Sequence, residues 1–187
     1  MQTRTEKGGK NSEGPIGTGL VIERRFTTIG EDPFDQFDWI EMDVEIRNAD
    51  GSLAHRIDDV RLPSGFSGVA GKVLAQKYLR KAGVPAILRK VKEKGVPTWL
   101  QRSEPDHEKL QSLDPEKRFI GESHGRELFR RLAGTWTYWG WKHGYFEAEA
   151  DARAYFDEMC YLIASQRSAP NSPQWFNTGL HWAYGIE

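Results

Sequence analysis

Apolar and acidic side chains alternate strictly over one stretch near the start of the chain. The apolar positions are Ile40, Met42, Val44 and Ile46, and the acidic positions between them are Glu41, Asp43 and Glu45. A period of two is typical of a strand with one buried face. Turn-forming residues follow at 48–51, and residues 53–62 can return as a partner strand. The pattern predicts a β-hairpin over residues 38–62 whose acidic outer face is solvated.

A period near 3.6 predicts helices after the hairpin. Either Ser64 or Ser67 can cap a helix over about 66–82, and a shorter helix is expected over about 86–94. The apolar stripe expected on the first of these helices is Val69, Val73, Leu74 and Tyr78. Both helices end at Gly-Val-Pro sequences, which stop helical structure.

Two longer helices are expected in the second half of the chain, over about 124–142 and about 147–168. Their buried faces would be Leu128, Phe129, Leu132, Trp136 and Trp139 on the first, and Ala152, Tyr155, Phe156, Met159, Cys160 and Ile163 on the second. Acidic residues at the start of the second helix suit its macrodipole. The expected fold is therefore mainly α-helical with a small β-hairpin.

The first residues differ in composition from the rest. Residues 1–19 contain five glycines and almost nothing to bury, so they are predicted to be a disordered lead-in. A short strand is expected over 20–26, and the mainly helical domain is expected to span residues 20–168.

Length and charge exclude some classes of protein. A chain of 187 residues is long enough to bury a core. The formal net charge of -1 argues against a nucleic-acid coat or a membrane-surface protein. No apolar run reaches the roughly 18 residues of a membrane span, and no signal-peptide pattern follows the first residues. We therefore expect a cytoplasmic protein.

The single cysteine, Cys160, can form neither an internal disulfide nor a CxxC pair. It falls on the apolar face of its predicted helix, which favours a structural buried thiol over a reactive one. One thiol and five scattered histidines give no zinc framework, so no metal site is predicted. The chain ends in a stretch still rich in aromatic residues, from which we expect the first part of a longer polypeptide.

A basic segment raises one alternative function. Between Lys72 and Arg102 there are nine Lys or Arg residues against one acidic residue, Glu93. Such a face suits a small basic helical module that binds nucleic acid or another polyanion. The competing interpretation is a solvated face paired with the acidic residues from Glu104 onward, and it is favoured because no aromatic side chains interleave with the charges.

Five of the seven tryptophans lie between Trp136 and Trp182, and the segment 170–179 adds turn-forming polar residues to them. Asn171 and Ser172 sit between Pro170 and Pro173, which restricts their backbone. Polar donors on a rigid extended loop can contact a phosphate or a small polar substrate. On physical grounds alone a structural Asx turn is favoured. Residues 176–179 are expected to end a short strand and then turn.

Segments spread over nearly all of the chain after residue 20 carry a family resemblance. They are Glu23-Arg-Arg-Phe-Thr-Thr28, Val73-Leu-Ala-Gln-Lys-Tyr-Leu-Arg-Lys-Ala-Gly-Val-Pro85, Leu132-Ala-Gly-Thr-Trp-Thr-Tyr-Trp-Gly-Trp141, Ser168-Ala-Pro-Asn-Ser-Pro-Gln-Trp-Phe-Asn-Thr-Gly179 and Leu180-His-Trp-Ala-Tyr-Gly-Ile186. Together they closely resemble the N-terminal part of adenosylcobalamin-dependent (class II) ribonucleotide reductases. Runs this long are specific.

The resemblance implies an enzyme that reduces ribonucleotides to 2'-deoxyribonucleotides for DNA synthesis. In that family, cobalt–carbon homolysis in adenosylcobalamin generates a cysteine thiyl radical that abstracts the ribose 3'-hydrogen, and a cysteine pair supplies the electrons. The long form of the family suggests a diphosphate substrate. The implied partners are the ribonucleotide, the remainder of the reductase (in the same polypeptide or a second chain) and, since family members are commonly dimeric, a second copy.

The family fold is a ten-stranded α/β barrel preceded by a mainly helical domain. On that pattern, residues 169–187 start the barrel and enter its first strand, and the barrel is not complete in this chain. The Asn-Ser-Pro position lies where the family holds the substrate phosphates, so Ser172 is the first expected contact and Asn171 the second. Cys160 matches none of the family's catalytic cysteines. No catalytic residue is therefore assigned, most cobalamin contacts are expected elsewhere, and the chain alone is expected to be inactive.

Overall fold

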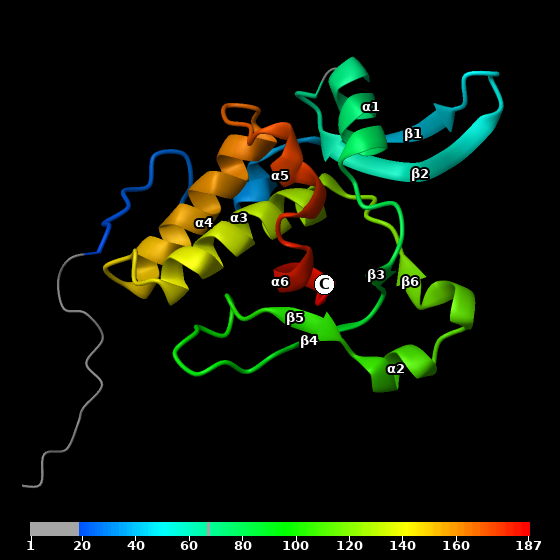
Figure 1. Ribbon diagram of the computed structural model, residues 1–187. Helices are drawn as coiled ribbons and strands as arrows, with labels where there is room; N and C mark the ends of the chain where they lie inside the picture. The colour runs from blue at the N-terminus through cyan, green and yellow to red at the C-terminus, as the bar shows by residue number, and fades with distance from the viewer. Residues whose placement is uncertain (1–18, 67) are drawn as a thin grey trace, which may run out of the picture.

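Two long helices lie side by side at the centre of the fold, α3 (Gly125–Lys142) and α4 (Glu149–Ala164) (Figure 1). This computed structural model describes residues 19–66 and 68–187. The predicted lead-in, apart from Gly19, and the proposed cap Ser67 lie outside the described residues. Both central helices were predicted by periodicity, and their bounds agree with the expected ones to within a few residues.

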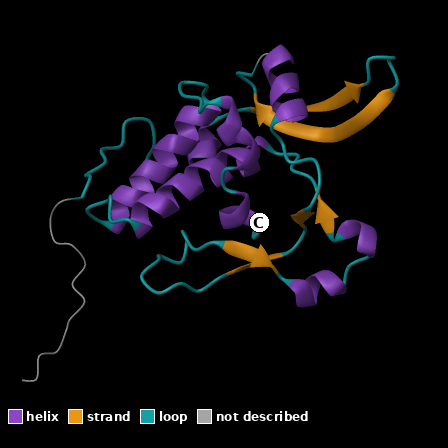
Figure 2. Cartoon of the chain, viewed as in Figure 1, coloured by secondary structure: helices purple, strands orange, loops and turns teal. Residues whose placement is uncertain are grey.

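Shorter elements surround this pair (Figure 2). In chain order they are η1 Pro33–Gln36, β1 Trp39–Arg47, β2 Leu53–Pro63, α1 Gly68–Lys77, β3 Val84–Pro85, β4 Leu88–Lys90, β5 Ser103–Pro105, α2 His107–Gln111, η2 Pro115–Lys117, β6 Phe119–Ile120, α5 Ser172–Asn177 and α6 Leu180–Tyr184. The strands form three antiparallel pairs, β1 with β2, β3 with β6 and β4 with β5. The described residues therefore form a mixture of helices and small antiparallel sheets.

The predicted hairpin is confirmed. β1 and β2 pair antiparallel with Val44 opposite Ile57, and Val44 is buried beneath the sheet. The outer face carries ion pairs as well as solvated carboxylates, since Arg61 Nε donates to Glu41 Oε2 at 2.8 Å. Period-two alternation was a reliable signal here because one face of the hairpin packs on the core and the other meets water.

The helix α1 is shorter than predicted, and the predicted stripe is only partly right. Leu74 and its neighbour Ala75 are buried, whereas Val69 is 76% and Val73 46% exposed. The helix lies against the hairpin through its Gly71 side, where an added Cβ would come within 3.2 Å of Met42 Cε. This close approach rotates the two valines away from the core.

Two local predictions are wrong. Residues 86–94 contain the strand β4, not a helix, because Leu88–Lys90 pair with Ser103–Pro105 and the tertiary pairing overrides helix propensity. Residues 20–26 do not form a strand beyond a single bridge between Leu20 and Phe146. Their amides bind side chains of α4 instead.

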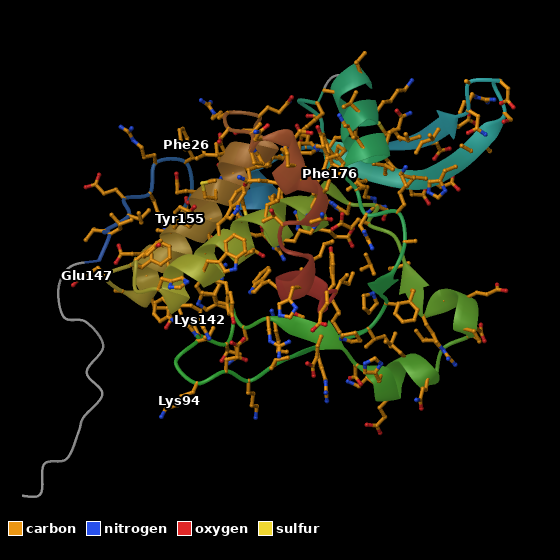
Figure 3. All side chains as sticks on the ribbon, in the orientation of Figure 1. Phe26, Lys94, Lys142, Glu147, Tyr155 and Phe176 are labelled. Carbon is orange, nitrogen blue, oxygen red and sulfur yellow. The ribbon has the colours of Figure 1, made fainter. Side chains whose placement is uncertain are left out.

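Acidic side chains at the start of α4 and just before it hold the beginning of the described chain. Glu147 Oε2 accepts from Gly19 N at 3.0 Å, and Asp151 Oδ1 accepts from Ile22 N at 2.9 Å. Phe26 stacks on Tyr161 of the same helix with ring centroids 5.1 Å apart. Figure 3 labels Glu147 near the start of α4 and Phe26 near the end of the same helix.

Glu158 is the strongest of these anchors. Its Oε1 accepts hydrogen bonds from the amides of residues 25–27 at 2.9 to 3.1 Å and from Thr27 Oγ1 at 2.7 Å. Beside it, Arg24 pairs with buried Asp157 at 2.8 Å. Three consecutive amides, which have no strand partner among the described residues, thus bind one carboxylate.

The main core lies between the hairpin, α1, α3 and α4. The predicted core residues Leu128, Phe129 and Leu132 are fully buried, whereas Trp139 at the end of α3 is 50% exposed. Four residues of the predicted inner face of α4 are buried (Ala152, Phe156, Cys160 and Ile163), and the other two, Tyr155 and Met159, are partly buried. Within residues 19–66 and 68–187, no helix has the length and hydrophobicity needed to cross a bilayer.

The expected strand at the end of the chain is wrong. Residues 172–177 and 180–184 are the short helices α5 and α6, separated by Gly179 at a φ of 88°. Asn171 caps α5, Pro173 sits in its first turn, and the left-handed Gly179 turns the chain between the helices. The assignment of residues 169–187 to the start of a barrel stays a prediction.

Candidate functional site

The two predicted contact residues lie at the junction between α4 and α5. Pro170 and Pro173 flank the pair, and Asn171 has an extended backbone at φ -59° and ψ 145°. Asn171 is the N-cap residue of α5, and its Oδ1 accepts from the adjacent Ser172 N at 2.9 Å. Trp175 Nε1 donates to Pro170 O at 2.9 Å and fastens the segment from its other side.

Ser172 meets a residue from far along the chain. The hydroxyls of Ser172 and Tyr78 share a hydrogen bond of 3.0 Å, although the residues are 94 positions apart. Tyr78 directly follows α1, and its ring packs against Trp175 and Phe176 with centroids 5.4 and 5.3 Å away. Phe176, labelled in Figure 3, thus lies on the side of α5 that meets the end of α1.

Ser172 lines a cavity of about 520 Å³ between α1, α4 and α5. The walls are mostly apolar and include Phe66, Leu74, Ile163 and Trp175. Asn171 is exposed and is not part of the wall. The structure therefore places the hydroxyl of Ser172 at a concave surface and leaves Asn171 beside it.

A smaller cavity of about 340 Å³ shares Tyr78 as a wall. Lys77, Arg80 and Lys81 border it together with Phe176. Lys77 Nζ also lies 5.7 Å from the centre of the Tyr78 ring. Three cationic side chains thus border the cavity on the other side of Tyr78 from the one that Ser172 lines, and cations favour an anion in their neighbourhood.

A buried arginine holds both sides of the junction. Arg131 of α3 donates from Nη1 to Thr178 O at 2.7 Å and from Nη2 to Trp175 O at 2.9 Å. The same Nη2 lies 3.2 Å from Tyr78 O. Its Nε donates to Glu122 Oε1 at 2.7 Å, and neither side chain is exposed. One guanidinium therefore connects α3 with the residues on both sides of the Ser172 contact.

Glu122 is satisfied from three directions. Besides Arg131, it accepts from Arg80 N at 2.8 Å and from Tyr184 Oη at 2.7 Å. Burial and the adjacent carboxylate raise the pKa of Tyr184, so the phenol stays protonated and remains a donor. Removing one member of this buried ion pair would lower stability strongly, because the other charge would remain buried without an opposite charge.

Sequence reasoning missed Tyr78, Glu122 and Arg131 as members of this junction. Tyr78 was placed on an apolar stripe only. Arg131 left a signal, since it shares the apolar face of α3 with Leu128 and Leu132 at helical spacing, where an arginine is unexpected. Glu122 lies in a polar stretch and gives no pattern of its own.

Similarity to known proteins decides the family. A sequence profile described as "Class II vitamin B12-dependent ribonucleotide reductase" matches residues 41–166, well over half of the chain. The chain belongs to that family. It is 55% identical over 168 residues to a vitamin B12-dependent ribonucleotide reductase of Bradyrhizobium diazoefficiens and 54% identical over 168 residues to that of Agrobacterium fabrum. Each match covers 90% of this chain and 13% of the relative.

A more distant reductase of the same name, from Streptomyces avermitilis, is 30% identical over 173 residues, covering 91% of this chain and 14% of the relative. The chain thus spans about one seventh of the length of the curated relatives that it matches, at their N-terminal part. The sequence-based assignment to the N-terminal region of a class II reductase is confirmed.

The one thiol of this reductase segment is inaccessible. Cys160 is fully buried in α4, and burial raises its pKa well above the ordinary value for a thiol. A buried, protonated thiol is a poor nucleophile and a poor redox partner. The structure therefore agrees with the structural role predicted for Cys160.

Two arginines of the basic segment form ion pairs within the fold, and one lysine binds a main-chain oxygen. Arg89 Nη2 donates to Glu104 Oε1 at 2.6 Å, and Arg102 lies within 4.0 Å of carboxylate oxygens of Glu93 and Glu104. Lys90 Nζ donates to Gln101 O at 2.6 Å. The alternative of a nucleic-acid-binding module is not favoured, because the chain belongs to the reductase family and three cations of the segment are engaged within the fold.

Other features of the segment carry no assigned role. An open cavity of about 650 Å³ at the far end of α3 has aromatic walls that include Trp136, Trp139 and Tyr155. Trp182 of α6 packs over Gly134, where a Cβ would come within 2.1 Å of its ring, so part of the tryptophan cluster braces α6 on α3. Among the described residues, no three His, Cys, Asp or Glu side chains are grouped as metal ligands.

Proposed function

We propose that this chain is the N-terminal segment of an adenosylcobalamin-dependent enzyme that reduces ribonucleoside diphosphates to 2'-deoxyribonucleotides. Family membership supports the reductase assignment, and the resemblance supports the adenosyl cofactor and the diphosphate. Within the segment, Ser172 would contact the substrate phosphates, with Asn171 as the second contact. The cytoplasm is the proposed location.

The observation that carries the site proposal is the placement of Ser172. Its hydroxyl lines a cavity, and Lys77, Arg80 and Lys81 border the neighbouring cavity across Tyr78. A hydroxyl donor with cations nearby suits an anionic group. Asn171 offers its amide nitrogen from the exposed side, since its oxygen is engaged by Ser172 N.

Most contacts to the cofactor are proposed to lie outside this segment. In the part of the chain that the structure describes, two mainly apolar cavities have volumes of about 650 and 520 Å³, which suit a drug-sized ligand and not a corrin with its nucleotide tail. We therefore derive no step through cobalamin here. The proposed partners of the segment are the remaining reductase polypeptide, the ribonucleotide and, in a homodimer, a second copy.

The test is Ser172→Ala in the full-length polypeptide that contains this segment. Loss of a hydrogen bond to a charged group should raise KM for the ribonucleoside diphosphate about tenfold or more, whereas loss of the hydrogen bond to Tyr78 should lower the melting temperature only slightly. Ser168→Ala is the matched control, because Ser168 lines the same cavity without a predicted phosphate contact. An unchanged KM in Ser172→Ala would remove the site proposal.

The competing nucleic-acid function is tested separately. A basic module predicts steeply salt-dependent binding of the 187-residue chain to DNA or RNA. We expect no binding even at low salt, because Arg89 and Arg102 are paired with Glu93 and Glu104 and the formal net charge of the chain is -1.

A further inference from the structure

The hydrogen bond between Tyr78 and Ser172 restricts what the serine hydroxyl can do. A serine hydroxyl carries one proton and two acceptor lone pairs, and it rotates to suit its partners. A phosphate oxygen only accepts, so Ser172 must give its proton to it. The 3.0 Å contact with Tyr78 then requires the phenol to be the donor.

We propose that Tyr78 positions Ser172: its phenol donates to Ser172 Oγ and thereby directs the serine proton toward a phosphate oxygen of the substrate. This inference rests on the proposed function of Ser172. The resulting chain runs from phenol to serine to phosphate, and consecutive donors in such a chain strengthen one another. Tyr78 acts through Ser172 and does not itself touch the ligand.

The position of Tyr78 is fixed independently of any ligand. Its ring packs between Trp175 and Phe176, at centroid distances of 5.4 and 5.3 Å. Arg131 Nη2 donates to the main-chain oxygens of both Tyr78 and Trp175, at 3.2 and 2.9 Å. Both sides of the Tyr78–Ser172 contact are therefore attached to one guanidinium, which is itself sealed from solvent against Glu122.

A purely structural role for Tyr78 makes a different prediction. Tyr78→Phe keeps the ring and its packing on Trp175 and removes only the hydroxyl, so the fold should be retained. If the Tyr78 hydroxyl only stabilised the junction, the change in KM from removing it would add to the change in KM from removing the Ser172 hydroxyl. If the Tyr78 hydroxyl orients the Ser172 hydroxyl, removing it should not change KM in a variant that already lacks the Ser172 hydroxyl.

The experiment is a double-mutant cycle in the full-length polypeptide that contains this segment. KM and kcat for a ribonucleoside diphosphate are measured for Tyr78→Phe, Ser172→Ala and the double variant. We expect Tyr78→Phe to raise KM about two- to tenfold with kcat unchanged, as loss of one binding hydrogen bond predicts. The double variant should have the KM of Ser172→Ala alone.

Tyr155→Phe is the matched control, since Tyr155 lines the aromatic cavity at the far end of α3 and should leave KM unchanged. The outcomes separate the two proposals. An unchanged KM in Ser172→Ala overturns the proposed function. A raised KM in Ser172→Ala, together with an unchanged KM in Tyr78→Phe or additive effects in the double variant, overturns the positioning role alone.

Discussion

Arg131 and Glu122 form an ion pair of 2.7 Å from which solvent is excluded on both sides. The pair joins α3 to the polar stretch before it, and the remaining Arg131 nitrogens hold Trp175 and Thr178. The helix α5, too short to be stable alone, is thus fixed to the core through main-chain carbonyls, and α6 is joined to the same pair by the Tyr184 hydroxyl, which donates to Glu122.

Glu122→Gln should lower the free energy of unfolding by about 3 kcal/mol or more, because it leaves the buried Arg131 charge uncompensated. Urea denaturation of the chain measures this loss. Glu41→Gln, which breaks an exposed pair with Arg61, is the control and should cost less than about 1 kcal/mol. Equal losses in the two variants would contradict the importance assigned to the buried pair.

Glu158 makes stability depend on pH. Burial opposes its ionisation, but hydrogen bonds from the Thr27 hydroxyl and the amides of residues 25–27 outweigh burial and lower its pKa from the ordinary value of 4.5. A folded pKa below the unfolded one gives stability that is complete above the unfolded value and is lost as pH falls through the folded value.

Glu158→Gln should therefore lower the free energy of unfolding by about 1–3 kcal/mol at neutral pH. Below pH 4.5 the variant should lose less of its free energy of unfolding than the wild type does. Urea denaturation of the wild type and the variant, from neutral pH to well below pH 4.5, measures the difference between the two curves. A constant difference at every pH would show that the Glu158 carboxylate is not linked to folding.

Gly134→Ala should displace α6. An added Cβ would lie 2.1 Å from the Trp182 ring, so the ring must move and the bond from Trp182 Nε1 to Leu100 O, 2.9 Å long, would break. We expect a loss of about 1–3 kcal/mol and a red-shifted tryptophan fluorescence. Gly68→Ala is the control, because its Cβ would meet nothing within 4 Å. An unchanged emission maximum in Gly134→Ala would contradict the packing.

Cys160 should react with a thiol reagent only when the chain unfolds. It is fully buried and its pKa is raised by burial, so the thiolate is scarce and inaccessible in the folded state. The absorbance of a chromogenic thiol reagent measures how much Cys160 has reacted. Its rise with increasing urea concentration should coincide with the unfolding transition of the chain. Val73→Cys, at a position that is 46% exposed, should add one thiol that reacts without denaturant. Rapid labelling of the wild type would refute the burial.

Long periodic segments were predictable from sequence, and contacts between distant segments were not. The hairpin, α3 and α4 follow patterns set by one buried face each, so alternation and helical spacing revealed them. The helix expected over 86–94 failed because pairing with residues 103–105 decides that segment. The strand expected at residues 176–179 failed because Asn171 and Gly179 define two short helices.

In the candidate site, too, residues with a local sequence signal were predictable and residues that depend on distant contacts were not. Asn171 and Ser172 were found from their local setting between two prolines and from the family resemblance. Tyr78 lies 94 positions from Ser172, and Glu122 lies 62 positions from Tyr184. No periodicity within either segment encodes such pairings, because they depend on how the folded helices meet.

The anchoring of residues 19–27 on α4 also affects how the chain is made. Thr27 and Glu158 are 131 positions apart, so the first described segment has no binding partner until most of the chain has been synthesised. At roughly 5–20 residues per second, the wait on the ribosome is on the order of ten seconds. During that time its amides are satisfied by water. Attachment of residues 19–27 should therefore follow formation of the hairpin, because it must wait until α4 has emerged from the ribosome. The entropy cost of closing this long loop is met only at that point.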